Sequence, residues 1–423
     1  MLDIKFIREN SDIVKNACAL KNISFDMDLL LSLDRELIGL KSEEQNVLTQ
    51  KNAVTAKIPK ASAEERPALI TESKSYDEKI KSCKTKIDEL DIKIKELLYL
   101  VPQIPSPKAP VGKDDSDNVE IKRAGVLPTF DFKPLDHVQI LEKHGWAEFE
   151  RIAKVSGSRS YSLRNEMVLV EMAMHKLALD KLMQKGFTVI SVPALAREEA
   201  LFGTGHFPTG RDQAYFLQED ELYLTGTAEV QINSLHAGEI LKESDLPILY
   251  AGYSPCFRRE AGSYGRDVRG LIRVHQFMKV EQFVICKNDA GESEKWHQKL
   301  LETSEEIVTD LGLPYRIVEC CTGDMGTGKV RMYDVEAWVP SENKYRETHS
   351  CSSLYDWQAR RTQTRYRDSD GKVQFVHTLN NTAIATPRIL VPFLENHQQA
   401  DGSIKIPEKF RPYLGGVEFL GKK

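Results

Sequence analysis

Several features are missing or scarce in this sequence of 423 residues, and each absence excludes a class of protein. No stretch approaches the ~18 uncharged apolar residues that a membrane span needs. The N-terminal segment MLDIKFIREN has no apolar core of signal-peptide length, so we expect a cytoplasmic protein without a membrane partner. Positive charge is not in excess, since 58 Lys and Arg residues stand against 63 Asp and Glu residues and the net charge is -5. A nucleic-acid partner must therefore be bound by local basic patches, and DNA is not expected as a partner.

Cysteine is also scarce and is not arranged in pairs. The seven cysteines are an odd number without a CxxC motif, which indicates reduced thiols of a cytosolic protein rather than a disulfide framework. His349 and Cys351 lie close together, but a zinc site needs a second pair of ligands. A structural role is therefore favoured for both residues.

A complete P-loop is missing from the sequence. The segment GDMGTGK, residues 323–329, has the spacing of this phosphate-binding motif. However, Val330 replaces the hydroxyl residue that would bind magnesium, and the following VRMYDVEAWV is typical of a strand rather than of a helix. A P-loop is therefore excluded.

A helical hairpin is predicted near the N-terminus, and the chain length favours two domains. Apolar residues recur in heptad steps along two segments, which predicts two helices that pack along a coiled-coil seam. The first segment contains Leu30, Leu33, Leu37, Leu40, Val47, Val54 and Ile58, and the second contains Tyr76, Ile80, Cys83, Ile87, Leu90, Ile94, Leu97 and Val101. Between them, Pro59 and Pro67 break the helix and Ser62 with Glu65 has capping-box spacing, so the chain is expected to reverse. At 1.5 Å per residue, about 28 residues give an arm of roughly 40 Å.

One stretch of this arm is rich in lysine. The segment KIKSCKTK contains Lys79, Lys81, Lys84 and Lys86 and no acidic residue. These lysines are suited to the phosphates of a polyanion, but a solvated helix face explains the same pattern.

A proline-rich linker separates the arm from the rest of the chain. The segment PQIPSPKAP has four prolines in nine residues and is followed by an acidic polar run. We therefore predict an N-terminal arm at 1–110, with its coiled coil at about 28–100, and a second domain at 111–423.

The second domain is predicted to be an α+β fold. Helical periodicity is found at 165–185 and 292–311. Short turns join most of the strand-like runs, which favours an antiparallel sheet flanked by helices over a doubly wound parallel sheet. These runs are FTVISVP, LYLTGTAEV, CFRRE, LIRVHQFMKVEQFVI, YDVEAWVP and QFVHTLNNTAIA.

An arginine-rich hairpin, CFRREAGSYGRDVRGLIRVHQF at 256–277, contains the residues most suited to chemistry. Strand alternation places Arg258 and Glu260 on one face of the first strand and Arg259 on the other. On the returning strand, Arg273, Phe277 and Glu281 share a face. Guanidinium groups bind phosphate, an aromatic ring stacks on a purine, and a carboxylate holds an amine. The hairpin therefore predicts a site for a nucleotide and an amino acid, although solvated arginines on a surface hairpin remain the alternative.

Two further segments extend this prediction. The loop of the hairpin combines arginine with glycine, which suits a polyphosphate or the end of a nucleic acid. Its residues are Gly262, Gly265, Arg266, Arg269 and Gly270. Near the C-terminus, NTAIATPRILVPFLENHQ predicts a helix with Thr386 as N-cap, Pro387 at the first position and Arg388 in the first turn, an arrangement that favours anions.

Taken together, these stretches resemble the class II aminoacyl-tRNA synthetases and, with the N-terminal hairpin, the bacterial-type seryl-tRNA synthetases. The resemblance covers essentially the whole chain: arm, linker, a first motif that ends at Pro193, a second in FRREAGSYGRDVRGLIRVHQF and a third in NNTAIATPR. It implies a homodimer with the first motif at the interface. It also implies a ligase that activates L-serine with ATP and Mg²⁺ and transfers it to tRNA(Ser), and to tRNA(Sec) where that tRNA exists.

The resemblance also implies roles for individual residues in binding ATP. Arg258 would hold the α-phosphate, Glu260 would bind the adenine amine, and Phe277 and Arg388 would enclose the base. Arg273 and Arg388 would meet the outer phosphates, so that Arg258, Arg273 and Arg388 act in catalysis. Further nucleotide contacts would come from Arg259, Val274, Glu347, Thr348, His349 and Ser350, with Glu347 and Ser350 as magnesium ligands.

The resemblance assigns the serine pocket and the tRNA contacts as well. The pocket would contain Thr227, Ala228, Glu229, Arg258, Glu281 and Thr382. Without the resemblance, Thr227 and Glu229 can be outward residues of a strand. The lysines at positions 79, 81, 84 and 86 would contact tRNA.

Two other functions share parts of this pattern. A ligase that loads serine onto a carrier protein would have the same active site but normally lacks the arm. A non-catalytic RNA-binding module would need the arm but not Arg258, Glu281 and Arg388 together.

Overall fold

The computed structural model describes residues 1–262, 265 and 269–422. These residues divide into two compact units, one of Leu2–Ala19 with Ile23–Pro102 and one of Met1, Leu20–Asn22 and Gln103–Lys423. The loop residue Arg266 lies outside the described residues, so its predicted role stays a prediction.

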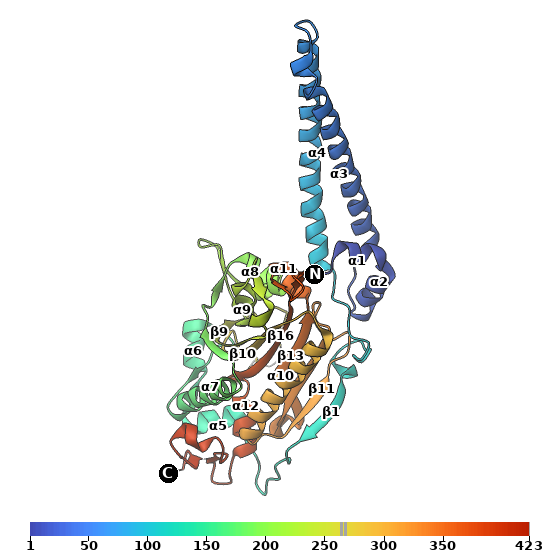
Figure 1. Cartoon of the computed structure of the whole chain (residues 1–423). Helices are drawn as coiled ribbons and strands as arrows, with labels where there is room; N and C mark the ends of the chain where they lie inside the picture. Colours follow the sequence, from blue (N-terminus) through green and yellow to red (C-terminus); the bar gives the residue numbers. More distant parts are fainter. Residues whose placement is uncertain (263–264, 266–268, 423) are drawn as a thin grey trace. The chain divides into compact units, whose positions relative to one another are not determined.

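The first unit is a helical arm. Figure 1 shows its two long helices, α3 (Met27–Thr55) and α4 (Arg66–Leu100), side by side, preceded by α1 (Ile4–Glu9) and α2 (Ser11–Leu20). The predicted seam is confirmed in most positions, with Leu98 rather than Leu97 buried in the last turn of α4. Its buried residues are Met27, Leu30, Asp34, Leu37, Val47 and Val54 in α3 and Cys83, Ile87, Leu90, Ile94 and Leu98 in α4.

Polar contacts fix the turn and the register of the arm. The Glu65 backbone N–H donates to Ser62 Oγ at 3.3 Å and the Ser62 backbone N–H donates to Glu65 Oε2 at 3.2 Å, which is the reciprocal pairing of a capping box in the turn before α4 begins at Arg66. Lys41 pairs with Asp91 at 3.2 Å across the two long helices. Arg8 of α1 pairs with the buried Asp34 of α3 at 2.6 Å, which joins these two helices.

The second unit is built on an eight-stranded sheet, which confirms the predicted α+β fold. Its strand order is β1-β11-β12-β13-β16-β10-β9-β4, and every pair is antiparallel except β4 with β9. The strands are β1 (Val119–Ala124), β4 (Thr188–Ser191), β9 (Ile248–Phe257), β10 (Gln276–Cys286), β11 (Tyr315–Glu319), β12 (Arg331–Val339), β13 (Lys344–Tyr355) and β16 (His377–Thr386).

Four small sheets surround the large one. They are formed by β2 (Ala147–Glu148) with β3 (Ser162–Leu163), by β5 (Leu195–Ala196), β7 (Leu222–Leu224) and β6 (Tyr215–Leu217), by β8 (Ile240–Lys242), β14 (Arg365–Arg367) and β15 (Val373–Phe375), and by β17 (Ile404–Lys405) with β18 (Phe419–Leu420).

Helices pack on both faces of the large sheet, and Figure 1 shows α10 lying along it. One face carries the main core with α7 (Glu166–Gln184), α10 (Ala290–Asp310) and α12 (Leu390–His397). The opposite face is covered at one end by α9 (Glu229–Leu235) and α11 (Trp357–Thr362), with α8 (Glu198–Thr204) beside them. The remaining helices are α5 (His137–His144) and α6 (Glu150–Ser156). The helices predicted at 165–185 and 292–311 thus correspond to α7 and α10.

Four predicted elements are wrong in detail, and one of them is the strand expected from CFRRE, because β9 ends at Phe257. The strand expected from LYLTGTAEV ends at Leu224, and Glu229 begins α9 instead. The strand expected from LIRVHQFMKVEQFVI begins only at Gln276. The C-terminal helix begins at Leu390 rather than after an N-cap at Thr386, because Thr386 still belongs to β16 and its hydroxyl bonds Glu171 Oε1 at 2.7 Å.

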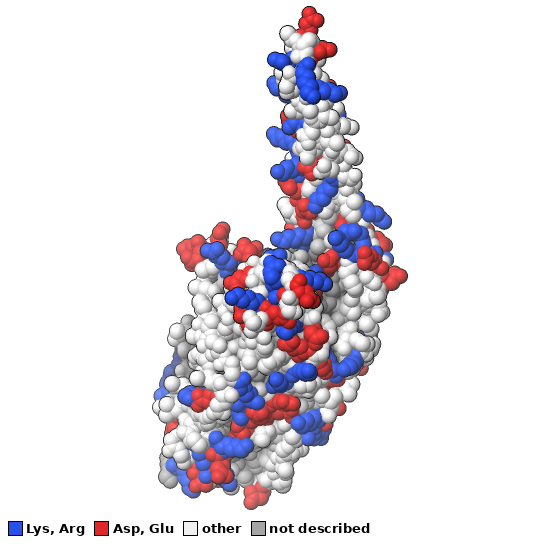
Figure 2. All heavy atoms as spheres, viewed as in Figure 1, with Lys and Arg blue, Asp and Glu red and all other residues white. Residues whose placement is uncertain are grey.

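Two sequence expectations concern the whole chain. All seven cysteines are among the described residues and are buried without a disulfide. No helix in the described part of the chain is both long and apolar enough to cross a bilayer. Figure 2 shows basic and acidic side chains interspersed over the visible face, as expected from the near balance of charge.

Candidate active site

Strand alternation on β10 aims three side chains at the open face of the sheet. Val280 and Val284 point into the main core with α7 and α10, whereas Phe277, Lys279 and Glu281 point the other way. Glu281 lies opposite Thr382 of β16, next to a register shift at Val280. The sheet therefore forms the floor of a cleft lined by an aromatic ring, an ammonium group and a carboxylate.

One hollow of this cleft has a volume of about 550 Å³ and is lined by most of the residues predicted to bind ATP. We call it the nucleotide-side hollow. The predicted residues that line it are Arg258, Glu260, Val274, Phe277, Glu347, Thr348, Thr382 and Arg388. These residues belong to three separate stretches of the sequence, the 256–277 hairpin, 347–348 and 382–388, and the fold brings them to one surface.

Arg258 and Phe277 are held against each other in this hollow. The Arg258 guanidinium carbon lies 5.2 Å from the centre of the Phe277 ring, within cation–π range. The Arg258 backbone N–H donates to His275 O at 2.9 Å, which ties the two connecting segments together. Gly226 allows the close approach, since a Cβ there would lie 3.2 Å from Arg258 Cγ and Nε. The arginine and the ring are therefore preorganised beside each other.

The backbone around Arg258 differs from the prediction. β9 ends at Phe257, so Arg258, Arg259 and Glu260 do not alternate along a strand. Glu260 has a positive φ of 53°, which turns its carboxylate toward Arg273, and the two groups pair at 2.6 Å. The end of the strand pairing frees this segment to place Arg258 and Glu260 in one hollow.

A second cationic surface lies beside the first hollow. Arg273, Arg346 and Arg388 line it together with Glu347 and Thr348. Arg388 Nη1 lies 3.5 Å from Glu347 Oε2, so β13 and the turn after β16 are linked by a charge pair. Arg346 was missed in the sequence, although it directly precedes Glu347, the first of four consecutive residues predicted to contact the nucleotide. Three guanidinium groups on one surface suit the outer phosphates of a nucleotide.

A further hollow has a volume of about 1030 Å³ and is lined by most of the residues predicted to bind serine. We call it the serine-side hollow. Thr227, Glu229 and Glu281 line it, and it shares Arg258, Lys279, Glu347 and Thr382 with the first hollow. Thr227 Oγ1 accepts from the Glu229 N–H at 3.2 Å, so the hydroxyl orients the first turn of α9. The helix, rather than the expected strand, therefore presents Glu229 to the hollow.

The two carboxylates of this hollow have different partners. Glu229 Oε1 accepts hydrogen bonds from Gln358 at 2.6 Å and from Asn380 at 2.7 Å. Glu281 is 2% exposed and pairs with Lys279, which is 6% exposed. Burial raises the pKa of both carboxyl groups, and the hydrogen bonds and the Lys279 ammonium oppose that rise.

Three titratable residues that line the hollow were not predicted. Lys279 lies between Phe277 and Glu281 at strand spacing, so the period of two would have identified it. His206 and Lys329 also line the hollow. Burial lowers the pKa of His206 to about 4, and the nearby Arg258, Lys279 and Lys329 contribute to that shift, so the imidazole is neutral at pH 7. Lys329 belongs to the GDMGTGK segment that was excluded as a P-loop, and its side chain enters the cleft by tertiary folding alone.

Several predicted residues lie elsewhere. The Ala228 side chain is fully buried in the apolar cluster behind α9, and Ala228 lines none of the hollows described above. The His349 ring is buried beneath the sheet and bonds Ala383 O at 3.0 Å. Arg259 is exposed and lines none of these hollows. Lys79, Lys81, Lys84 and Lys86 are all exposed on α4.

The cleft offers hard oxygen ligands as well as cations. Glu347 and Ser350 project from the same face of β13 and line the serine-side hollow. Carboxylate and hydroxyl oxygens beside a phosphate site are ligands that suit Mg²⁺. The arrangement can therefore bind an anionic chain, a flat base and an ammonium group side by side.

Comparisons with known proteins place this geometry in a family. The model of the class II tRNA synthetase core domain for G, H, P, S and T matches residues 215–397, and that of the seryl-tRNA synthetase N-terminal domain matches residues 1–105. A serine–tRNA ligase of Deinococcus radiodurans is 58% identical over 100% of this chain and 99% of the relative.

Solved structures agree with the sequence matches. The crystal structure of seryl-tRNA synthetase from Pyrococcus horikoshii complexed with ATP has a TM-score of 0.93 at 40% identity and covers 99% of both chains. That of the cytoplasmic serine–tRNA ligase from Naegleria fowleri in complex with AMP has a TM-score of 0.88 at 27% identity, covering 99% of this chain and 98% of that one.

Proposed function

The chain belongs to the seryl-tRNA synthetase family and ligates serine to tRNA, and on that premise we propose that the cleft described above activates L-serine as seryl-adenylate before the transfer. One observation carries the proposal: Arg258 lines both the nucleotide-side and the serine-side hollow. A single guanidinium group can thus contact the α-phosphate where it meets the serine carboxylate.

In this proposal the protein aligns two substrates and supplies no nucleophile. Phe277 stacks on adenine, Glu260 accepts from its amine, and Arg273 and Arg388 hold the outer phosphates. A serine carboxylate oxygen forms a bond to the α-phosphorus as the bond from that phosphorus to pyrophosphate breaks. The terminal ribose hydroxyl of the tRNA then attacks the seryl carbonyl, loses its proton and displaces AMP. Arg258 stabilises the charge that develops at the α-phosphate.

Magnesium fits the site through Glu347 and Ser350. When bound, the ion would neutralise phosphate charge between these two oxygen ligands. Arg388 pairs with Glu347 in the structure, so the arginine also orients the carboxylate that would hold the ion.

Serine is selected by polar groups that would remain unpaired with a smaller amino acid. Thr227, Glu229 and Glu281 surround the serine-side hollow, and alanine would leave at least one of their buried polar atoms without its partner. Threonine must be excluded by lack of room for one methyl group, which discriminates less strongly.

ATP–pyrophosphate exchange with serine, threonine and alanine tests this assignment. We expect serine to be preferred over alanine by about 10⁴-fold in kcat/KM and over threonine by a smaller factor. Glu229→Gln should raise the KM for serine by roughly 10-fold or more through the loss of a charged hydrogen bond, whereas the control Glu239→Gln, at an exposed position, should not. Exchange that is stimulated best by another amino acid would refute the proposal.

The arm is proposed to bind tRNA(Ser), and tRNA(Sec) where it exists, by backbone and shape. Its exposed lysines at 79, 81, 84 and 86 support this role. Deletion of residues 27–100 should spare pyrophosphate exchange and abolish charging. Replacing these four lysines by alanine should weaken tRNA binding and flatten its salt dependence more than replacing the exposed Lys93 and Lys95. Equal loss of exchange and charging would contradict the proposal.

A homodimer is proposed through the face of α7 and β4. This face exposes large apolar side chains: Val168 at 37%, Leu169 at 61%, Met172 at 62% and Val189 at 39%. Apolar groups gathered on neighbouring elements are typical of an interface. Sedimentation should show a dimer that Leu169→Glu with Met172→Glu dissociates and that the control Ile92→Glu, at an exposed arm residue, leaves intact.

A cytoplasmic location is proposed from the unpaired thiols and from the substrates. The seven buried cysteines form no disulfide, which agrees with a reducing compartment. Fractionation of the native cells with a tagged chain would test the location, and recovery in a membrane or secreted fraction would refute it.

A further inference from the structure

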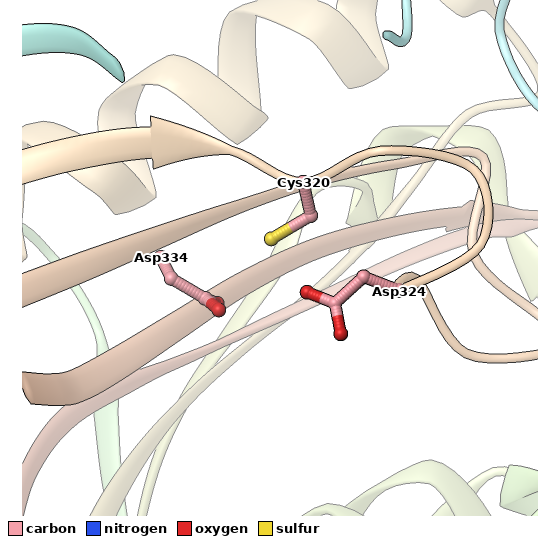
Figure 3. A group of neighbouring side chains, drawn as sticks. All are labelled: Cys320, Asp324 and Asp334. Atoms are coloured by element: carbon pink, nitrogen blue, oxygen red, sulfur yellow. The ribbon is translucent and has the colours of Figure 1, made fainter. Parts of the chain in front are cut away.

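Three potential metal ligands converge around the end of β11 and the neighbouring β12, where Asp334 pairs with Ser350 of β13. Figure 3 shows Cys320, Asp324 and Asp334 with the Cys320 sulfur directed toward the two carboxylates. One ligand atom from each residue lies within 4.8 Å of the others. Cys320 directly follows β11, Asp324 lies in the turn after it, and Asp334 belongs to β12. A thiol and two carboxylates are therefore gathered from three consecutive segments.

A buried oxygen of this cluster is left without a hydrogen bond. Asp334 is 7% exposed, and its Oδ1 has no hydrogen-bond partner among the described residues. Cys320 is fully buried. A buried carboxylate oxygen without a partner loses hydration and gains nothing in return. Cys320 and Ser350 hydrogen-bond the Asp334 side chain and Lys329 lies near it, but Oδ1 itself has no donor in the part of the chain that the structure describes.

Hydrogen bonds of the neighbouring Asn118 hold the Asp324 carboxylate in place. Asn118 Nδ2 donates to Asp324 Oδ2 at 2.8 Å, while Asn118 Oδ1 accepts from the Cys321 N–H at 2.9 Å. One amide thus orients both the carboxylate and the backbone next to Cys320. Hydrogen-bonded ligands of this kind are typical of built metal sites.

The turn between the ligands is also held rigidly. The Thr322 N–H donates to Pro110 O at 2.8 Å and the Gly323 N–H donates to Gly112 O at 3.1 Å. A Cβ at Gly323 would lie 2.3 Å from Lys113 O, so only glycine permits this contact. The three ligands are therefore positioned by the fold and need little rearrangement to bind an ion.

We propose that Cys320, Asp324 and Asp334 bind one zinc-class divalent cation, with a water in the fourth position. Zinc accepts cysteine sulfur and carboxylate oxygen in a tetrahedral site, whereas magnesium and calcium take oxygen alone. Binding replaces the thiol proton, which goes to solvent, by a metal–sulfur bond. The pair His349 and Cys351 takes no part, because the His349 ring nitrogens bond Thr348 Oγ1 and Ala383 O.

Such an ion would act on the active site through the chain that leaves the turn. Residues 326–329 begin two positions after Asp324 and line the serine-side hollow, and Lys329 is one of its cations. A metal that joins β11, the turn and β12 would fix the start of this segment. The ion would thus have a structural role beside Ser350, one of the two oxygen ligands proposed for magnesium.

Cobalt titration of the full chain, with Mg²⁺ in excess to fill oxygen-only sites, tests the proposal. We expect one equivalent of Co²⁺ to give a thiolate-to-cobalt charge-transfer band that Zn²⁺ abolishes. Cys320→Ser and Asp334→Asn should lose the band, and the matched control Cys321→Ser should keep it. No band at one equivalent, or an equal band in Cys320→Ser, would overturn the proposal.

A second measurement, of thermal stability, tests the site even where one of the variants folds poorly. Zn²⁺ should raise the melting temperature of the wild type and of Cys321→Ser but leave that of Cys320→Ser unchanged. An equal rise in all three proteins would refute the site. The ATP-side magnesium ligands contain no sulfur, so failure of the zinc site leaves the proposed ligase mechanism unaffected.

Discussion

Removal of the Phe277 ring tests the core of the proposed nucleotide site. The ring lines the nucleotide-side hollow and lies 5.2 Å from the Arg258 guanidinium carbon. Stacking of a base on an aromatic side chain contributes about 1–3 kcal/mol. At 1.4 kcal/mol per tenfold, Phe277→Ala should raise the KM for ATP by roughly 5-fold to 150-fold.

The same substitution has a small expected cost in folding. Phe277 faces the cleft rather than the main core, so its removal leaves a wider hollow and not a sealed cavity. Arg258 loses a cation–π contact of about 0.5–1 kcal/mol, and a modest fall in kcat is expected from the freer guanidinium.

Pyrophosphate exchange at varied ATP and saturating serine measures both parameters. Phe277→Trp should restore most of the affinity, because a larger ring still stacks. The control Phe216→Ala removes a ring that is 50% exposed and should leave the KM for ATP unchanged. A KM for ATP that stays within twofold of the wild type in Phe277→Ala would refute adenine stacking at this position.

Four further perturbations follow from the structure. Gly252→Ala would place a Cβ 2.4 Å from Ile232 Cδ1, so the free energy of unfolding should fall by about 1–3 kcal/mol. The KM for serine should rise as well, because α9 shifts. Gly39→Ala has nothing within 4 Å of the added Cβ, and in urea melts it should instead raise the free energy of unfolding by about 0.5–1 kcal/mol. Burial lowers the pKa of His297 to about 4, so the unfolded chain binds the extra proton and stability falls as the pH drops from about 6.5 toward 4. His297→Gln should reduce the slope of unfolding free energy against pH by up to about 1.4 kcal/mol per unit, while an unchanged slope would contradict the burial argument. Glu347→Gln should raise the Mg²⁺ concentration needed for half-maximal exchange, and an unaltered Mg²⁺ dependence would remove Glu347 from the metal site.

The arm was largely predictable because its determinants are local. Heptad spacing fixes which side chains meet when two helices pack, and a capping box acts over four residues. The seam from Leu30 to Ile94 and the turn at Ser62 follow from these short-range rules. The prediction of Leu97 instead of Leu98 as a buried residue fails only in the last turn of α4, where the seam ends.

The site was predictable where residues lie on regular strands and was missed where tertiary contacts decide. Phe277 and Glu281 follow from a period of two, which also contains Lys279. Arg258 and Glu260 reach the same hollow only because β9 ends early, and strand alternation contains no information on that. Lys329 enters the cleft from a segment about fifty residues beyond Lys279, and no local pattern marks it. The order of strands in the sheet likewise depends on long-range packing.

The left-handed backbone at Glu260 restricts which side chains can replace this residue of the proposed nucleotide site. A φ of 53° is tolerated well by glycine, asparagine and aspartate and poorly by branched or bulky side chains. A mutant library that randomises this position will therefore lose many members to misfolding before any change in base preference can be selected. A changed nucleotide preference is more accessible through Val274 or Thr348, because neither residue is among the described residues with a positive φ.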